Sequence, residues 1–295
     1  MKQLVVISGK GGTGKTVISA SLAALIKKVV IADCDVDAAN LHLLLRPQLE
    51  ESHKFTGGKK AKVDPANCTS CGECLKVCRF SAIEENPSCG IIIDPISCEG
   101  CGICSYVCPT EAIAMEENIS GEWFVSKTKY GPFIHARLGI AEENSGKLVT
   151  EVRKKAKEIA DKINLDLVII DGPPGIGCPV IASLSGTDLA LVVTEPTLSG
   201  IHDMERVTQM AYHFQTKTAC CINKFDLNTK NSEKIENWCQ RNSVPVIGKI
   251  PFDDDVTKSL VQGVPLVEYS NNSVAKEIKK IGERLMKLLK EDSNQ

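Results

Sequence analysis

The stretch LVVISGKGGTGKT, residues 4–16, decides the fold, because an apolar run leads directly into a glycine-rich loop that ends in Gly-Lys-Thr. Residues 4–7 are apolar throughout, which is typical of a buried parallel strand. Glycines let consecutive backbone N–H groups turn toward phosphate oxygens, and a following helix adds the positive end of its dipole. The stretch therefore predicts a nucleotide phosphate site between a strand and a helix.

The loop also assigns roles to its own residues. Its backbone would cradle the phosphates through Gly9, Lys10, Gly11, Gly12, Thr13 and Gly14. Lys15 would reach the β- and γ-phosphates, and the hydroxyl of Thr16 would hold Mg²⁺. The sequence therefore predicts an ATP or ADP site that depends on Mg²⁺.

Strand and helix patterns alternate on both sides of one interruption. Further strands are predicted at residues 29–32, 167–170, 189–193, 218–222 and 246–250, and amphipathic helices at 17–27, 148–163 and 274–289. This alternation predicts an α/β fold with a mostly parallel sheet covered on both faces. Polar residues follow several of these strands, and sites in open α/β sheets form at that edge.

The interruption covers residues 57–121 and contains two identical cysteine runs, C-x2-C-x2-C-x3-C. We expect a small α+β insert there, with the ATPase domain formed by residues 1–56 and 122–295. This spacing is that of a two-cluster ferredoxin, in which the fourth cysteine of each run binds the other cluster. One [4Fe–4S] cluster would take Cys68, Cys71, Cys74 and Cys108, and the second would take Cys98, Cys101, Cys104 and Cys78.

Zinc and disulfides are the alternatives for these cysteines. Structural zinc sites favour closed sets of four ligands with long gaps between pairs, which these runs do not have. Disulfides are disfavoured because the chain begins with a strand and has no apolar leader, so we expect a cytoplasmic protein. Arg79 either raises the potential of one cluster or is a solvated surface residue. Cys178 is expected to be a packing residue, with a ligand role for a cluster shared across a dimer as the alternative.

Lys10, a second lysine inside the loop, is the mark of the deviant loop of the MinD/ParA class of P-loop ATPases (SIMIBI class), which this chain resembles outside the insert. The resemblance implies that Lys10 reaches the nucleotide of a partner chain in a dimer. It further implies that Asp35 positions the attacking water, Asp171 lies in the Mg²⁺ shell, and Asn223 reads the adenine edge. Pro251 would line the base pocket.

With its insert, the chain resembles MinD-like ATPases that are grouped with cobyrinic acid a,c-diamide synthase. Amidation itself is not expected, since a chain of 295 residues has no room for an ammonia-supplying glutaminase domain. The formal net charge of -2 gives no support for nucleic-acid binding. No apolar run is long enough for a membrane span. Residues 274–289 are expected to pack on the sheet, with membrane-surface contact as the alternative.

The sequence supports three functions. The first is a dimerising ATPase switch, built from two copies or from a copy and a paralogue, that couples nucleotide state to electron transfer with a redox partner protein. The second is an iron–sulfur assembly or carrier factor. The third is a MinD-like positioning ATPase whose clusters sense redox state.

Overall fold

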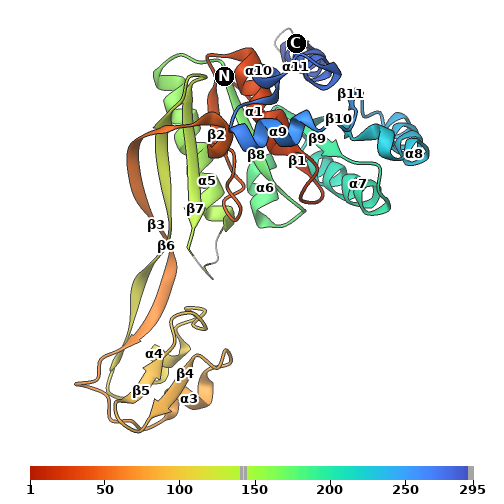
Figure 1. The fold of residues 1–295 in the computed structure, drawn as a ribbon. Coiled ribbons are helices and arrows are strands. Elements are labelled where there is room, and N and C mark those ends of the chain that lie inside the picture. Colours follow the sequence, from red (N-terminus) through yellow and green to blue (C-terminus); the bar gives the residue numbers. More distant parts are fainter. Residues whose placement is uncertain (140–141, 143–144, 292–295) are drawn as a thin grey trace. The chain divides into compact units, whose positions relative to one another are not determined.

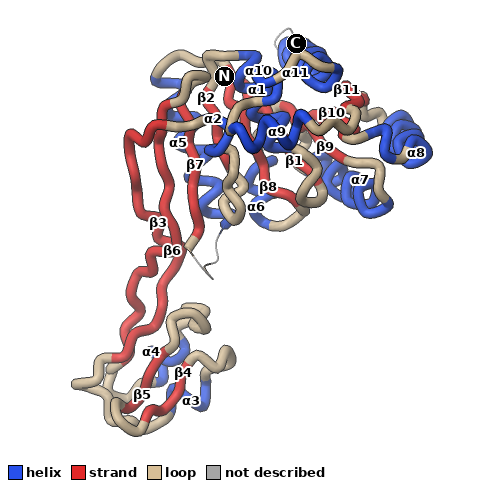
Figure 2. Tube along the Cα trace, viewed as in Figure 1, coloured by secondary structure: helices blue, strands red, loops and turns tan. Residues whose placement is uncertain are grey.

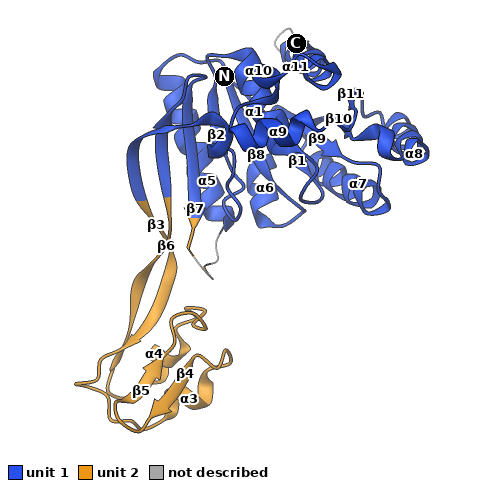
Figure 3. Cartoon of the chain, in the orientation of Figure 1, with its two compact units in different colours: residues 1–53, 123–137, 145–295 blue, residues 54–122, 138–144 orange. Residues whose placement is uncertain are grey.

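The computed structural model describes residues 1–139, 142 and 145–291. The chain divides into two compact units (Figure 3). The first comprises residues 1–53, 123–137 and 145–295, and the second comprises residues 54–122 and 138–144.

The sheet of the first unit is built from parallel neighbours. Seven of its strands are β1 (Lys2–Ser8), β2 (Val30–Asp33), β7 (Pro132–Leu138), β8 (Leu167–Pro174), β9 (Leu189–Thr194), β10 (Lys217–Asn223) and β11 (Val246–Ile250). They lie in the order β11-β10-β9-β1-β8-β2-β7, and each neighbouring pair is parallel. The predicted α/β fold with a mostly parallel sheet is therefore confirmed. The sheet continues through β6 (Ile113–Lys127) and β3 (Gln48–Val63), which contribute residues to both units.

Helices cover both faces of this sheet (Figures 1 and 2). One face carries α1 (Lys15–Ile26), α10 (Leu266–Tyr269) and α11 (Ser273–Glu291), and the other carries α5 (Ser145–Lys162), α6 (Cys178–Leu184), α7 (Leu198–His213) and α8 (Thr229–Arg241). Side chains alternate between faces along a strand, so Leu4 and Val6 join the core beneath α1 and α11 while Val5 and Ile7 are buried on the opposite side. Shorter helices are α2 (His42–Leu45), the 3-10 turn η1 (Phe225–Leu227) and α9 (Asp255–Gln262).

The apolar stripe of α11 packs into the core, as expected. Val274, Ile278, Ile281, Leu285 and Leu289 are all at most 4% exposed and belong to the same cluster as α1. Among the described helices, none combines the length and apolar character that a membrane span requires.

β7, most of β3 and most of β6 lie where the sequence predicted no strand. β3 begins at Gln48, inside the region assigned to the ATPase domain, and β6 and β7 fill the stretch before α5. Most side chains of β3 are exposed, so its sequence lacks the apolar alternation by which strands are recognised. β8 also extends past Asp171 to Pro174, because it continues to pair with β1 as far as Ser8.

The second unit is built from two similar halves. Besides its parts of β3 and β6, its described elements are α3 (Glu73–Val77), β4 (Ile83–Asn86), β5 (Gly90–Ile93) and α4 (Ile103–Val107). β4 pairs with β5 in antiparallel fashion. Gly72 and Gly102 precede the two helices with φ of 75° and 77°. Cys78 and Cys108 end them with the same φ of -72°. The repeat in the sequence is therefore a repeat in backbone conformation.

Candidate nucleotide site and cysteine cavities

A cleft opens at the carboxyl ends of the parallel strands of the first unit. Predicted site residues on its wall are Gly11, Gly12, Gly14, Lys15, Thr16, Asp35, Asn223 and Pro251. Residues from the glycine loop, from the end of β2 and from the ends of β10 and β11 thus meet at one edge of the sheet. Gly9, Lys10, Thr13 and Asp171 lie outside this wall, and their places are described below.

Asn223 holds the glycine loop in place. Its Nδ2 donates to the carbonyl of Thr13 at 2.7 Å, and its Oδ1 accepts from the backbone N–H of Lys224 at 3.0 Å. Gly14 has φ +91°, and a Cβ placed there would come within 2.5 Å of Asn223 Nδ2. The loop conformation therefore requires glycine at this position for two reasons, the backbone angle and the close approach.

Lys15 lies among three aspartates at the base of the cleft. It is 6% exposed, and desolvation lowers its pKa. The negative charges of Asp171, Asp35 and Asp33 act in the other direction and raise it, but by less. Burial likewise raises the pKa of Asp35, although the charge of Lys15 lowers it. A buried cation facing several carboxylates is an arrangement that a bound phosphate and a divalent cation would complete.

Asp171 and Asp33 are adjacent residues on paired strands, and both are fully buried. Asp33 accepts from the backbone N–H groups of Asp35 and Leu41, and burial followed by the charge of Asp171 raises its pKa well above its usual value. Asp171 Oδ1 accepts from Ser19 at 2.7 Å, while Oδ2 has no hydrogen-bond partner among the described residues. Burial raises the pKa of Asp171 to about 6. The unpartnered oxygen fits a water of a Mg²⁺ shell, whose ligands are oxygens.

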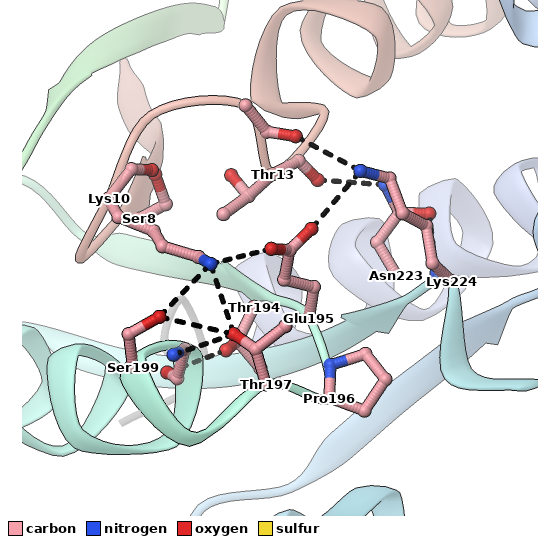
Figure 4. A network of polar contacts seen from close by, with 12 residues as sticks. Ser8, Lys10, Thr13, Thr194, Glu195, Pro196, Thr197, Ser199, Asn223 and Lys224 are labelled. Carbon is pink, nitrogen blue, oxygen red and sulfur yellow. Dashed lines mark hydrogen bonds and ion pairs between the residues drawn. The ribbon is translucent and has the colours of Figure 1, made fainter. Parts of the chain in front are cut away.

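The side chain of Lys10 contacts residues of its own chain, in the polar network that Figure 4 shows. Its Nζ lies 2.6 Å from Glu195 Oε1, 3.0 Å from Thr197 Oγ1 and 3.2 Å from Ser199 Oγ. Glu195 Oε2 in turn accepts from Lys224 Nζ at 3.1 Å, and Lys224 also donates to the carbonyl of Gly12. Burial would raise the pKa of Glu195, but these two lysines hold it below its usual value.

Sequence reasoning named no role for Glu195 or Lys224, and for Asp33 it gave only a place beside Asp35 in a predicted switch segment. The available signal was their position, since each stands at or just after the carboxyl end of a parallel strand.

The second unit contains two cavities, and each is lined by four cysteines. One is lined by Cys68, Cys71, Cys74 and Cys108, and the other by Cys78, Cys98, Cys101 and Cys104. These are the two crossed groups that the spacing rule of two-cluster ferredoxins names. The assignment of iron–sulfur clusters to them stays a prediction.

The surroundings of Cys108 suit a thiolate ligand, whereas burial raises the pKa of the Cys74 and Cys104 thiols. The backbone N–H of Ala112 donates to Cys108 Sγ at 3.3 Å. Burial opposes ionisation of Cys108, but hydrogen bonds from Thr110 and the backbone bring its pKa below the usual value. Cys74 and Cys104 are buried with Ile83, Ile91 and Ile113, so much of the unit's small core lies beside the cavities.

No group of three or more His, Cys, Asp or Glu side chains has the arrangement of a site for one metal ion within residues 1–139, 142 and 145–291. A cubane holds its four thiolates farther apart than a single ion does, because the sulfurs bind different iron atoms. Cys178 is exposed at the start of α6 in the first unit. Arg79 is also exposed.

A strand, a glycine loop closed by a buried lysine, and carboxylates at neighbouring strand ends define a P-loop nucleotide-binding protein. The family model described as "CobQ/CobB/MinD/ParA nucleotide binding domain" matches residues 4–266, and the chain belongs to this family. It is a P-loop ATPase of the MinD/ParA type.

Three relatives illustrate the range of similarity. A protein of Methanocaldococcus jannaschii described as uncharacterized is 36% identical over 293 residues, with 97% of each chain covered. An iron-sulfur cluster carrier protein of Pyrococcus horikoshii is 23% identical, over 98% of this chain and 87% of the relative. The solved structure of the septum site-determining protein MinD of Pyrococcus horikoshii, complexed with Mg-ADP, matches with a TM-score of 0.60. It is 19% identical and covers 97% of this chain and 96% of that one, which shows a shared fold.

Proposed function

We propose that this ATPase is a dimerising switch that carries two [4Fe–4S] clusters and couples its nucleotide state to electron transfer with a redox partner protein. The observation that carries the proposal is the grouping of eight cysteines into two cavities of four on the same chain as a P-loop ATPase. Clusters held by thiolates would supply one-electron chemistry there.

Residues of the cleft account for the nucleotide part. Lys15 and the loop backbone would bind the phosphates of ATP, and Thr16 with Asp171 would hold Mg²⁺ and its water shell. Asp35, on the wall of the same cleft, would position the attacking water. Asn223, which would read the adenine edge, donates to the carbonyl of Thr13, so one side chain would connect base binding to the phosphate loop.

The ligand assignment is tested first, with paired serine variants and iron analysis of protein made without oxygen. If the crossed sets are correct, Cys78→Ser combined with Cys98→Ser leaves one cluster's iron and EPR signal intact. Cys78→Ser combined with Cys68→Ser instead perturbs both. Cys89→Ser is the matched control, since Cys89 is an exposed cysteine of the same unit that lines neither cavity. Equal damage from both pairs would reject the crossed assignment.

Coupling is tested by midpoint potentials. The clusters are titrated without nucleotide, with ADP, and with a non-hydrolysable MgATP analogue, in the intact protein and in Lys15→Ala. A shift of tens of millivolts in the intact protein that Lys15→Ala abolishes supports electron transfer gated by nucleotide. Equal potentials in all three states would remove this function.

An iron–sulfur carrier is the second candidate, and one observation favours it. The relative named as an iron-sulfur cluster carrier protein aligns over 98% of this chain. In that case the clusters would be cargo, and an apo-ferredoxin mixed with the loaded protein would gain clusters at a rate that ATP changes. Retention of all iron by this chain would exclude the carrier.

A further inference from the structure

We propose that Glu195 is a positioning residue that acts as a latch: it holds Lys10 on its own chain and so controls the release of Lys10 to a second chain. The inference rests on the proposed nucleotide-dependent dimer. It assigns to Glu195 a part in dimer formation that depends on its contact with Lys10 and not on contact with the nucleotide.

The latch uses the full donor capacity of Lys10. A lysine ammonium has three N–H donors and no acceptor. In this structure Nζ has three partners, Glu195, Thr197 and Ser199, at 2.6, 3.0 and 3.2 Å. No donor is left for a phosphate, so Lys10 must leave at least one of these partners before it can bind a nucleotide held by another chain.

The backbone around Lys10 is anchored, so release is a side-chain movement. Ser8 Oγ donates to the carbonyl of Lys10 at 2.6 Å. A Cβ on the preceding Gly9 would meet Asp203 of α7 at 2.4 Å, which shows how closely the loop rests on that helix. Thr197 is the N-cap of α7 and accepts from the N–H of Gly200, so its position is fixed independently of Lys10.

Lys224 reduces the electrostatic cost of releasing Lys10 from Glu195. Glu195 is part-buried, with a side chain 16% exposed, and a part-buried carboxylate without a counter-ion is costly. Its two oxygens serve two lysines, Oε1 for Lys10 and Oε2 for Lys224. When Lys10 departs, Lys224 remains as the counter-ion, so Glu195 is not left unpaired.

The test uses Glu195→Gln in the full chain with its clusters, purified without oxygen. An amide keeps the size of the side chain, but it has one acceptor oxygen where the carboxylate has two and makes hydrogen bonds about half as strong. In each chain, the weaker contact should raise the equilibrium constant for release of Lys10 by about tenfold. A dimer of identical chains releases two such lysines. Analytical ultracentrifugation with a saturating non-hydrolysable MgATP analogue should therefore show a dimer dissociation constant lower by between about tenfold and a hundredfold.

Three further variants separate positioning from a structural effect. Ser199→Ala removes one weaker partner and should shift the dimer in the same direction by about twofold to threefold. Glu195→Asp, which restores a carboxylate, should return part of the intact protein's behaviour. The matched control is Glu236→Gln, which disrupts the exposed pair of Glu236 with Lys249 and should leave the dimer unchanged.

The outcomes distinguish the latch from the dimer on which it rests. If the intact protein dimerises with the analogue and Glu195→Gln dimerises equally or less tightly, the latch is wrong and the dimer stands. If the combined Glu195→Gln and Lys10→Ala variant dimerises as tightly as Glu195→Gln alone, Glu195 does not act through Lys10, and the proposal also fails. If neither the intact protein nor any variant dimerises, the dimer itself fails, and the latch fails with it.

Discussion

Replacing Gly14 with alanine should destabilise the first unit by about 2–3 kcal/mol, and part of this loss should vanish when Asn223 is also replaced. A residue with a Cβ at φ +91° costs about 1–2 kcal/mol. The new Cβ would also displace Asn223 Nδ2, 2.5 Å away, from its hydrogen bond to Thr13, which contributes about 1 kcal/mol. Asn223→Ala removes that bond and the one from Lys224 N–H, for about 2 kcal/mol.

The double variant cannot lose the bond to Thr13 twice. Its expected destabilisation is about 3–4 kcal/mol. The sum of the two single-variant destabilisations should therefore exceed that of the double variant by about 1 kcal/mol. Urea unfolding without nucleotide measures this, with tryptophan fluorescence as the signal, because Trp123 and Trp238 both belong to the first unit. Additivity within about 0.3 kcal/mol would refute the reasoning, since independent sites add to that precision.

Two neighbouring glycines supply matched controls for the separate contributions. Gly12 has φ +75° with open space around its Cβ position, so Gly12→Ala should show the backbone cost alone, about 1–2 kcal/mol. Gly11 has open space and no such angle, so Gly11→Ala should stay within about 0.5 kcal/mol of the intact protein. Neither control should couple to Asn223→Ala.

Lys15→Ala should abolish nucleotide binding, measured by calorimetry, yet leave cluster absorbance intact because the cysteine cavities belong to the other unit; loss of both would contradict this independence. Burial raises the pKa of Asp171 from 3.8 to about 6, so the folded metal-free chain retains a proton that the unfolded chain releases, and this group's contribution to stability falls as pH rises across that interval. The increase in melting temperature given by MgADP should therefore grow over the same interval in the intact protein but not in Asp171→Asn, and equal pH dependence in both would exclude Asp171 as its source. Leu285→Ala, at a fully buried position of α11, should cost about 2–5 kcal/mol in urea unfolding, and a loss below about 1 kcal/mol would mean that α11 does not pack as described.

The parallel part of the sheet could be predicted because its strands are buried on both faces and are therefore almost continuously apolar. Residues 4–7 and 189–193 illustrate this, and β1 and β9 lie there. Most of β3 was not predicted because most of its side chains are exposed, and its pairing with β6 identifies it as a strand.

The candidate sites divide along a similar line. Residues that belong to one short motif could be predicted from their spacing, as in the loop around Lys15 and the runs around Cys71 and Cys101. Glu195 was not predicted because its contacts are with Lys10 and Lys224, which lie far from it in the sequence. A single sequence does not reveal such contacts. A charged residue after a strand is common, and only its contacts show what it does.

The order of the strands has a consequence for synthesis on the ribosome. β1 is made first, yet its sheet neighbours are β8 and β9, so it stays unpaired until residues 167–194 have been synthesised. The contacts of β4 with β5 join residues close in sequence, from Ile83 with Ile93 to Asn86 with Gly90, and such local contacts form quickly. The cysteine-bearing unit can thus be complete while the chain still lacks strands that the ATPase fold requires. We expect insertion of the proposed clusters to precede nucleotide binding in each molecule.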